Sequence, residues 1–195
     1  ISIPYWFIGP GWKYGAGGQF GASGTYYQHN LSTGVKTVYL ANEHWYWGTP
    51  GPSYVLPSRI TDSQWDNNPM RLLVTRGAVL EVKTADTFFA TKNVELGVGT
   101  ASGYLQIDEA VTLKNLNVVY GSVYHRANTT AKSYFLDLTV LENLTIAATT
   151  SAEINASGKG YSAGNGPGGG VANGAGGGHG GVGGRWADGA NGGGV

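Results

Sequence analysis

The chain has 195 residues, of which 41% are hydrophobic and only 12% are charged, roughly half of the usual quarter for a soluble domain. Twelve Lys and Arg balance twelve Asp and Glu without a basic run or stripe, so the attraction that drives nucleic-acid binding is missing. No stretch approaches the roughly 18 consecutive apolar residues of a membrane span, so we expect neither a nucleic-acid partner nor a membrane span.

Residues 1–70 combine aromatic residues with turn-forming pairs, such as those in Gly9-Pro10-Gly11 and Pro50-Gly51-Pro52. Pairs of proline and glycine mark turns because proline presets φ and glycine accepts conformations that other residues avoid. This region is therefore predicted to consist of short strands joined by tight loops.

Four aromatic residues of this region are candidates for contact with a glycan or with another subunit: Trp45, Tyr46, Trp47 and Trp65. The faces of Trp and Tyr stack on sugar rings while neighbouring amides bond the sugar hydroxyls. Aromatic residues also concentrate in the cores of protein interfaces. Glycan binding and subunit contact both follow from these residue types.

From residue 71 to residue 157 the pattern changes to short runs in which apolar and polar residues alternate. Leu80-Glu81-Val82 and Leu105-Gln106-Ile107 are examples. Alternation with a period of two, together with β-branched residues, indicates strands. No segment shows sustained apolar residues at helical spacing or a capping box. The fold class predicted for this body is all-β.

Three segments of the body share one pattern: a charged residue, Asn, an apolar residue, a polar residue and an apolar residue. Their asparagines are Asn93, Asn115 and Asn143, at spacings of 22 and 28 residues. Such spacings are typical of a solenoid in which each coil is one supersecondary unit. Asn tolerates the left-handed conformation of a corner, and its amide can bond the same amide one coil away. We therefore predict a ladder of these three asparagines.

The stacked Asn and aliphatic residues resemble those of right-handed parallel β-helix proteins of surfaces and fibres, over residues 71–157. The resemblance implies a solenoid-like, parallel β-helix body. The alternative is an antiparallel β-sandwich with a disordered glycine tail, because a sandwich also has short strands at regular spacing.

Residues 158–195 form a third region, which holds more than half of the 34 glycines. Every third residue from Gly160 to Gly193 is Gly or Ala. Collagen is excluded because it requires Gly strictly and much proline, whereas this tail contains only Pro167. A helix with three residues per turn places the first residue of each triplet on one edge. That edge carries Asn173, His179, Val182, Arg185, Asp188 and Asn191.

The period of the tail resembles that of the polyglycine II bundles in phage tail-fibre adhesins and in some glycine-rich antifreeze proteins. This resemblance implies helices that pack closely through their small residues. A disordered glycine linker is the alternative.

Four sites fit the acceptor pattern for N-linked glycosylation: Asn30, Asn128, Asn143 and Asn155. They favour a protein at the cell surface, on a virion or otherwise outside the cell. The chain contains no cysteine, so disulfides do not contribute to this argument. Because it begins at Ile1 and ends within a glycine-rich run, we expect a processed chain or part of a longer one.

Groups for catalysis are sparse. The carboxylates that lie near each other in sequence are Asp62 with Asp66, Asp108 with Glu109, and Asp137 with Glu142. The histidines are scattered, and no nucleophile elbow or metal-binding loop is present. We therefore predict no enzymatic activity, no catalytic residue, no metal and no cofactor.

These patterns together predict a structural component of an extracellular filament, appendage or surface adhesin that acts by self-assembly. Its partners would be copies of itself or other modules of a longer chain. The alternative is a carbohydrate- or receptor-binding module of a fibre or cell surface, with surface glycans as partners. A polysaccharide lyase or hydrolase is the third possibility.

Overall fold

The computed structural model describes residues 24–42, 56–61, 70–162 and 165–166. The chain divides into two compact units, one of residues 1–124 with 136–155 and the other of residues 125–135 with 156–195. The first unit contains the ten strands of the described part of the chain and one short 3-10 helix, η3 (Thr87–Thr91). No α-helix occurs among the described residues. The predicted all-β class is confirmed.

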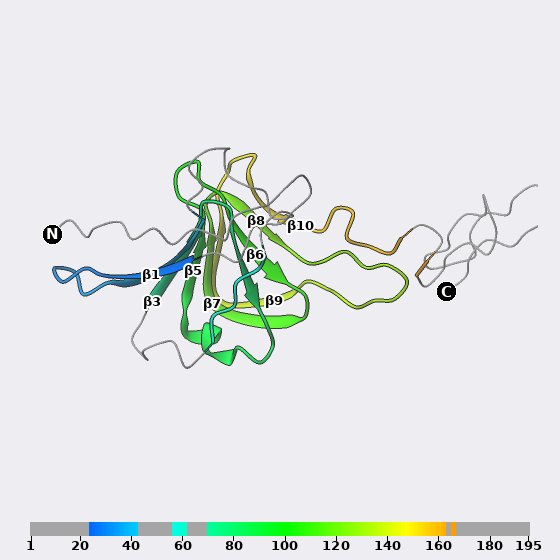
Figure 1. Ribbon diagram of the computed structural model, residues 1–195, viewed down its shortest axis with the longest axis horizontal. Helices are drawn as coiled ribbons and strands as arrows, with labels where there is room; N and C mark the ends of the chain where they lie inside the picture. Colours follow the sequence, from blue (N-terminus) through cyan, green and yellow to red (C-terminus); the bar gives the residue numbers. More distant parts are fainter. Residues whose placement is uncertain (1–23, 43–55, 62–69, 163–164, 167–195) are drawn as a thin grey trace, which may run out of the picture. The chain divides into compact units, whose positions relative to one another are not determined.

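Six strands form one sheet in the order β1-β2-β3-β5-β7-β9 (Figure 1). They are β1 Gly24–His29, β2 Lys36–Ala41, β3 Met70–Thr75, β5 Asn93–Leu96, β7 Ala110–Val118 and β9 Asp137–Ile146. The second sheet has the order β10-β8-β6-β4. Its strands are β4 Ala78–Val82, β6 Gly103–Ile107, β8 Gly121–Tyr124 and β10 Ala152–Asn155.

Neighbouring strands run parallel in both sheets, except that β1 and β2 form an antiparallel hairpin. This pairing differs from the antiparallel neighbours of a β-sandwich. From β3 onward the chain alternates between the sheets, so each strand from β5 onward pairs with the strand two places before it. Asn93 lies opposite Asn115, and Asn115 lies opposite Asn143, at separations of 22 and 28 residues. The spacings seen in the sequence are thus the lengths of chain between in-register strands.

The hydrophobic core is built from columns of apolar side chains that repeat from strand to strand. In the six-stranded sheet one column is Leu72, Val94 and Leu116, and in the four-stranded sheet another is Leu80, Leu105 and Val123. All six side chains are buried in one cluster, which also includes Phe89 of η3. Burying a side chain of this size stabilises the fold by about 1.5–3 kcal/mol. The period-two alternation therefore decides which face of each strand enters the core.

Glycines occupy the corners where the chain passes between the sheets. Gly97, directly after β5, has a φ of 77°, and Gly121, at the start of β8, has a φ of 130°. A Cβ atom at Gly121 would lie 1.8 Å from the carbonyl oxygen of Gly103, and one at Gly103 would lie 1.9 Å from that of Val74. Only glycine allows the backbones of neighbouring corners to approach this closely.

Candidate functional site

The outer face of the six-stranded sheet carries a column of amide side chains. Asn115 Nδ2 donates a hydrogen bond to Asn93 Oδ1 at 2.8 Å, and Asn143 Nδ2 donates to Asn115 Oδ1 at 3.0 Å. The structure thus brings together the three residues for which a ladder is predicted. The in-register parallel strands place these amides at successive positions about 4.8 Å apart.

The contacts of Asn115 determine which way each amide of the ladder points. Its Oδ1 also accepts the backbone N–H of Asn143 at 2.9 Å, and its Nδ2 also donates to Glu142 Oε2 at 2.9 Å. A backbone N–H can only donate and a carboxylate can only accept. Asn93 must therefore accept and Asn143 must donate. Among the described residues, Asn93 Nδ2 and Asn143 Oδ1 have no hydrogen-bond partner.

A register shift explains why Glu142 reaches this face. Between Leu113 and Asn115 the pairing of β7 with β9 shifts by one residue, so β9 contains a bulge. The hydrogen bond from Asn115 holds the pKa of the Glu142 carboxyl below its ordinary value of 4.5. Desolvation opposes this shift, and the ammonium of Lys114, 3.5 Å from Glu142 Oε1, lowers the pKa further.

We expect Asn115→Ala to raise the pKa of Glu142 toward its ordinary value, because the variant removes the strongest stabilising contact of the carboxylate. Since the folded-state pKa lies below the unfolded one, ionised Glu142 stabilises the fold above the unfolded pKa. That contribution is lost as the pH falls through the folded pKa. NMR titration of the side-chain carboxyl measures the midpoint. Lys114→Ala is the comparison and should raise it less, whereas an unchanged midpoint in Asn115→Ala would contradict the assignment.

A groove of about 520 Å³ lies on the same face. Its lining comes from residues 33–36 of the β1–β2 hairpin and from residues of β3, β5, β7 and β9. A second column of side chains runs through the groove, in which Asn117 Nδ2 donates to Glu95 Oε2 at 3.3 Å. Arg71, which lies opposite Asn93, forms an ion pair with Glu95. Thr145 lies opposite Asn117 on β9. The groove therefore combines uncharged amides and a hydroxyl with the ion pair of Arg71 and Glu95 and with Lys36.

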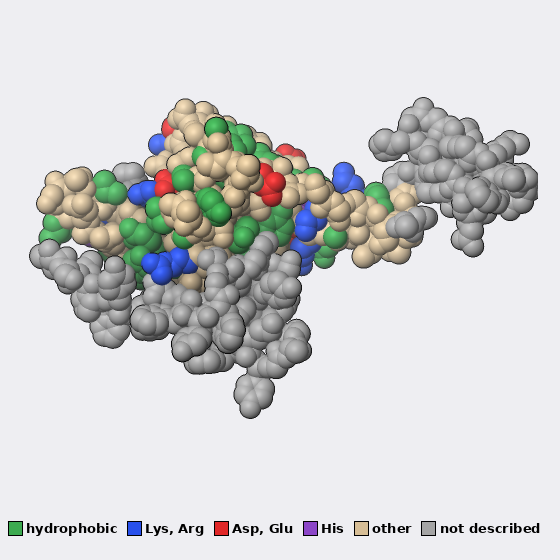
Figure 2. All heavy atoms as spheres, turned by 90° about the horizontal axis from the view of Figure 1, so that it is seen from above, with side chains coloured by type: hydrophobic (Ala, Val, Ile, Leu, Met, Phe, Trp, Pro, Cys, Tyr) green, Lys and Arg blue, Asp and Glu red, His purple; other side chains and the backbone are tan. Residues whose placement is uncertain are grey.

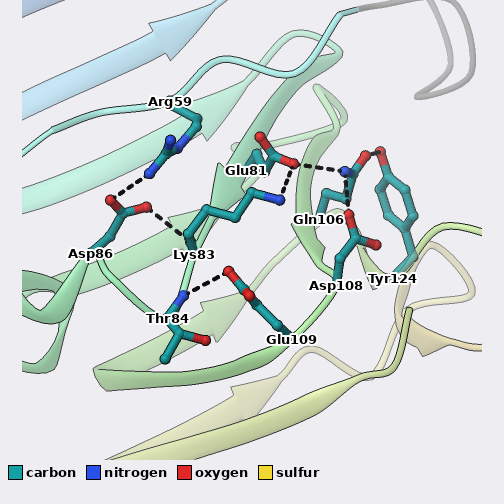
Figure 3. A network of polar contacts seen from close by, with 9 residues as sticks. All are labelled: Arg59, Glu81, Lys83, Thr84, Asp86, Gln106, Asp108, Glu109 and Tyr124. Carbon is teal, nitrogen blue, oxygen red and sulfur yellow. Dashed lines mark hydrogen bonds and ion pairs between the residues drawn. The ribbon is translucent and has the colours of Figure 1, made fainter. Parts of the chain in front are cut away.

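A second group of polar side chains lies on the four-stranded sheet (Figure 3). Gln106 Nε2 donates to Asp108 Oδ2 at 2.8 Å and to Glu81 Oε1 at 3.4 Å. Tyr124 donates its hydroxyl to Gln106 Oε1 at 3.4 Å, and Lys83 Nζ lies 2.8 Å from Glu81 Oε1. The sequence pairing of neighbouring carboxylates missed this group because β4, β6 and β8 bring its members together from distant positions.

The network continues on the segment that follows β4. Asp86 accepts hydrogen bonds from Arg59 at 2.8 Å and from the backbone N–H of Lys83 at 2.9 Å. The carboxylate of Glu109 accepts the backbone N–H of Thr84 at 2.9 Å. Figure 3 shows each carboxylate directed at a donor. These partners favour a role in joining neighbouring strands and loops.

The last strands, β9 and β10, leave the core columns uncovered. Leu144 lies in register with the buried Leu116 but is 48% exposed. Ile154 of β10 lies in register with the buried Val123 but is 42% exposed. Both strands are the edges of their sheets, and no other strand of the described part of the chain pairs with those edges. This coil, residues 137–155, is named the terminal coil.

The predicted glycosylation sites lie in different environments. Asn30 is exposed in the turn between β1 and β2, and its Oδ1 accepts the backbone N–H groups of the next two polar residues at 3.0 and 3.2 Å. Asn143 belongs to the ladder, and Asn155 Nδ2 donates to Glu153 at 2.7 Å. Asn128 is buried in the second unit.

We expect a glycan at Asn30 and none at folded Asn128 when the chain is secreted from a eukaryotic host. The Nδ2 atom that would carry the glycan at Asn128 donates to the carbonyl oxygens of Tyr134 at 2.8 Å and Lys159 at 3.3 Å. The Nδ2 atom of Asn30 has no hydrogen-bond partner among the described residues. Glycopeptide mass spectrometry measures the occupancy, with Asn30→Gln as the control. Full occupancy at Asn128 in the folded, secreted chain would contradict the prediction.

The predicted contact residues Trp45, Tyr46, Trp47 and Trp65 lie outside the described residues. The same holds for the predicted tail edge of Asn173, His179, Val182, Arg185, Asp188 and Asn191. Within the described part of the chain, His, Asp and Glu form no group of three that could hold a metal. None of its helices has the length and hydropathy to cross a membrane.

Figure 2 shows one face of the molecule, on which the coloured charged side chains are few and of both signs. They lie among hydrophobic and uncharged polar groups. This distribution agrees with the low charged fraction of 12%.

Comparison of the chain with protein-family models, with curated proteins and with solved structures found no match.

Proposed function

We propose that the chain is a structural module of an extracellular filament, appendage or surface adhesin, and that it acts by end-to-end self-assembly without catalysis. Its body is a parallel β-helix in this proposal. Support comes from the alternation of the chain between the two sheets from β3 onward, with parallel pairing throughout that part, and from the register of Asn93, Asn115 and Asn143. Stacked coils place backbone hydrogen bonds along one axis, which gives stiffness without disulfides.

The uncovered terminal coil is the observation that carries the proposal. Soluble monomers protect a sheet edge with charges, proline, bulges or a covering segment. Strand β9 has ten residues, no proline, one bulge next to Glu142, and two charged residues, Asp137 and Glu142, so most of its length carries none of these protections. Glu142 is already bonded to Asn115. A long edge beside exposed apolar side chains favours association with another sheet edge.

A second copy docked on the terminal coil would cover the two sheet edges and the apolar side chains that are exposed there. It would pair the backbone groups of the edge and bury the exposed halves of Leu144, Ile146 and Ile154, at about 1 kcal/mol for each side chain. The formal net charge of the chain is +0, so little repulsion opposes the approach of copies. The three-residue period of the tail supports lateral packing between neighbouring modules.

The polar network of Figure 3 favours a structural role over polysaccharide cleavage. Glycoside hydrolysis needs one carboxylic acid that can donate a proton and a second carboxylate across the sugar. Asp86 is paired with Arg59, Glu81 with Lys83, and Asp108 accepts from Gln106. Each of these carboxylates already has a hydrogen-bond donor or a cation of the chain as its partner.

The test is a double substitution on the terminal coil, Leu144→Lys with Ile154→Lys. Light scattering after size exclusion and negative-stain electron microscopy, over a range of concentrations, report the assembly. We expect the unmodified chain to form filaments and the double variant to stay monomeric. Both side chains are about half exposed, so the Tm of the monomer should change little.

Leu31→Lys is the matched control because Leu31 lies in the β1–β2 turn and is 77% exposed. It adds one lysine away from the terminal coil, against two in the double variant, and should leave assembly intact. An unmodified chain that is monomeric at every concentration, or a double variant that assembles equally well, would overturn the proposal.

A further inference from the structure

We propose that the groove on the outer face of the six-stranded sheet binds a neutral, hydroxyl-rich glycan chain. This site is separate from the self-assembly proposed above. It is built from the Asn ladder and from the second column of Glu95, Asn117 and Thr145, all of which line the groove. None of these positions belongs to the aromatic region in which sequence reasoning placed a glycan platform.

The groove presents hydrogen-bonding groups that have no partner among the residues that the structure describes. Asn93 Nδ2 offers a donor, because only the Oδ1 of that residue is bonded. Asn117 Oδ1 offers an acceptor, because only its Nδ2 is bonded. The Thr145 hydroxyl has no partner among the described residues and can both donate and accept. A sugar hydroxyl also donates and accepts, so it can satisfy each of these groups.

The charges favour a neutral ligand over an anionic or cationic one. Arg71 is held by Glu95, and the other oxygen of Glu95 accepts from Asn117. A sulfated or carboxylated glycan would meet Lys36, which also lines the groove, but it would in addition have to break the ion pair of Arg71 or approach Glu95. A neutral ligand leaves both contacts intact, and its binding is insensitive to salt.

The arrangement of the groups favours an extended ligand. Asn117 and Thr145 lie opposite each other on neighbouring strands, about 4.8 Å apart in the direction across the sheet. They can therefore contact adjacent hydroxyls of one sugar or of consecutive sugars. Val35 lines the groove and is exposed, which provides an apolar surface for the C–H face of a ring. A peptide strand would need a free sheet edge for its backbone, and this groove lies on a sheet face.

The test begins with a glycan array that carries neutral oligosaccharides beside sulfated and carboxylated ones, incubated with the unglycosylated full chain. The neutral oligosaccharide that binds best is then titrated by calorimetry. Thr145→Val removes the hydroxyl, and Asn93→Asp removes the free donor while it keeps the oxygen that accepts from Asn115. Each variant should weaken binding about fivefold, the value of one hydrogen bond.

Thr112→Val is the control, because Thr112 is exposed on β7 and does not line the groove. It should bind as the unmodified chain does. Circular dichroism of the variants checks that the fold is retained. Binding of neutral oligosaccharides with the expected losses would support the site. Absence of neutral binding, binding of anionic glycans alone, or unchanged affinity in both groove variants would overturn it.

Discussion

Gly121→Ala is expected to destabilise the fold by about 4 kcal/mol, from backbone strain together with a steric clash. The residue has a φ of 130°, and its new Cβ would lie 1.8 Å from the carbonyl oxygen of Gly103. That oxygen belongs to the backbone of the adjacent coil, so it cannot rotate away as a side chain would. Chemical denaturation followed by circular dichroism measures the free energy of unfolding.

Substitutions at two other glycines show how much of the expected destabilisation comes from backbone strain and how much from the steric clash. Gly99 has a φ of 59° and nothing within 4 Å of an added Cβ, so Gly99→Ala should cost only the backbone strain of about 1 kcal/mol. At Gly103 a Cβ would meet the carbonyl oxygen of Val74 at 1.9 Å. Gly103→Ala should therefore cost clearly more than Gly99→Ala. If the three variants had equal free energies of unfolding, the backbone at Gly103 and Gly121 would be able to move away from an added Cβ at no cost in stability.

Phe89→Ala should also destabilise the fold by about 4 kcal/mol, because it leaves a cavity in the core. Phe89 is fully buried in η3 and belongs to the cluster that contains the core columns. Its neighbour Phe88 packs against it with ring centroids 4.4 Å apart but is only partly buried.

Phe88→Ala is the matched control for this prediction, because it removes the same atoms from a site that water already reaches. We expect its loss of unfolding free energy to be less than half that of Phe89→Ala. Denaturant titration of both variants gives the comparison. If the two losses were equal, the η3 segment would contribute to stability as a surface element and not through the core.

Much of the fold was predictable because its strands repeat a residue pattern that can be recognised in the sequence. Apolar residues at alternate positions, as in Leu105 and Ile107, identify strands with one buried face. Asn93, Asn115 and Asn143 recur because they occupy the same register position on the neighbouring strands β5, β7 and β9. The alternation of apolar residues therefore predicts the strands, and the spacing of the asparagines predicts which strands lie in register.

Other features depend on contacts that have no local pattern. The bulge that brings Glu142 to Asn115 arises from pairing between β7 and β9. The bond from Gln106 to Glu81 requires β6 to be paired with β4 first. The sequence alone also does not distinguish Gly103 and Gly121 from the other glycines of the chain, because the backbone atoms that crowd them belong to residues distant in sequence. These features follow from tertiary structure.

The orientation of the ladder amides has a consequence for symmetry. Asn143 donates to Asn115, which donates to Asn93, so the column presents a bare acceptor, Asn143 Oδ1, on the terminal coil. Two copies that met through their β9 strands about a two-fold axis would bring two such acceptors together. A copy that arrived with a different surface could supply a donor instead. Any filament grown from this coil would therefore be polar, with chemically different ends that elongate and can be capped independently.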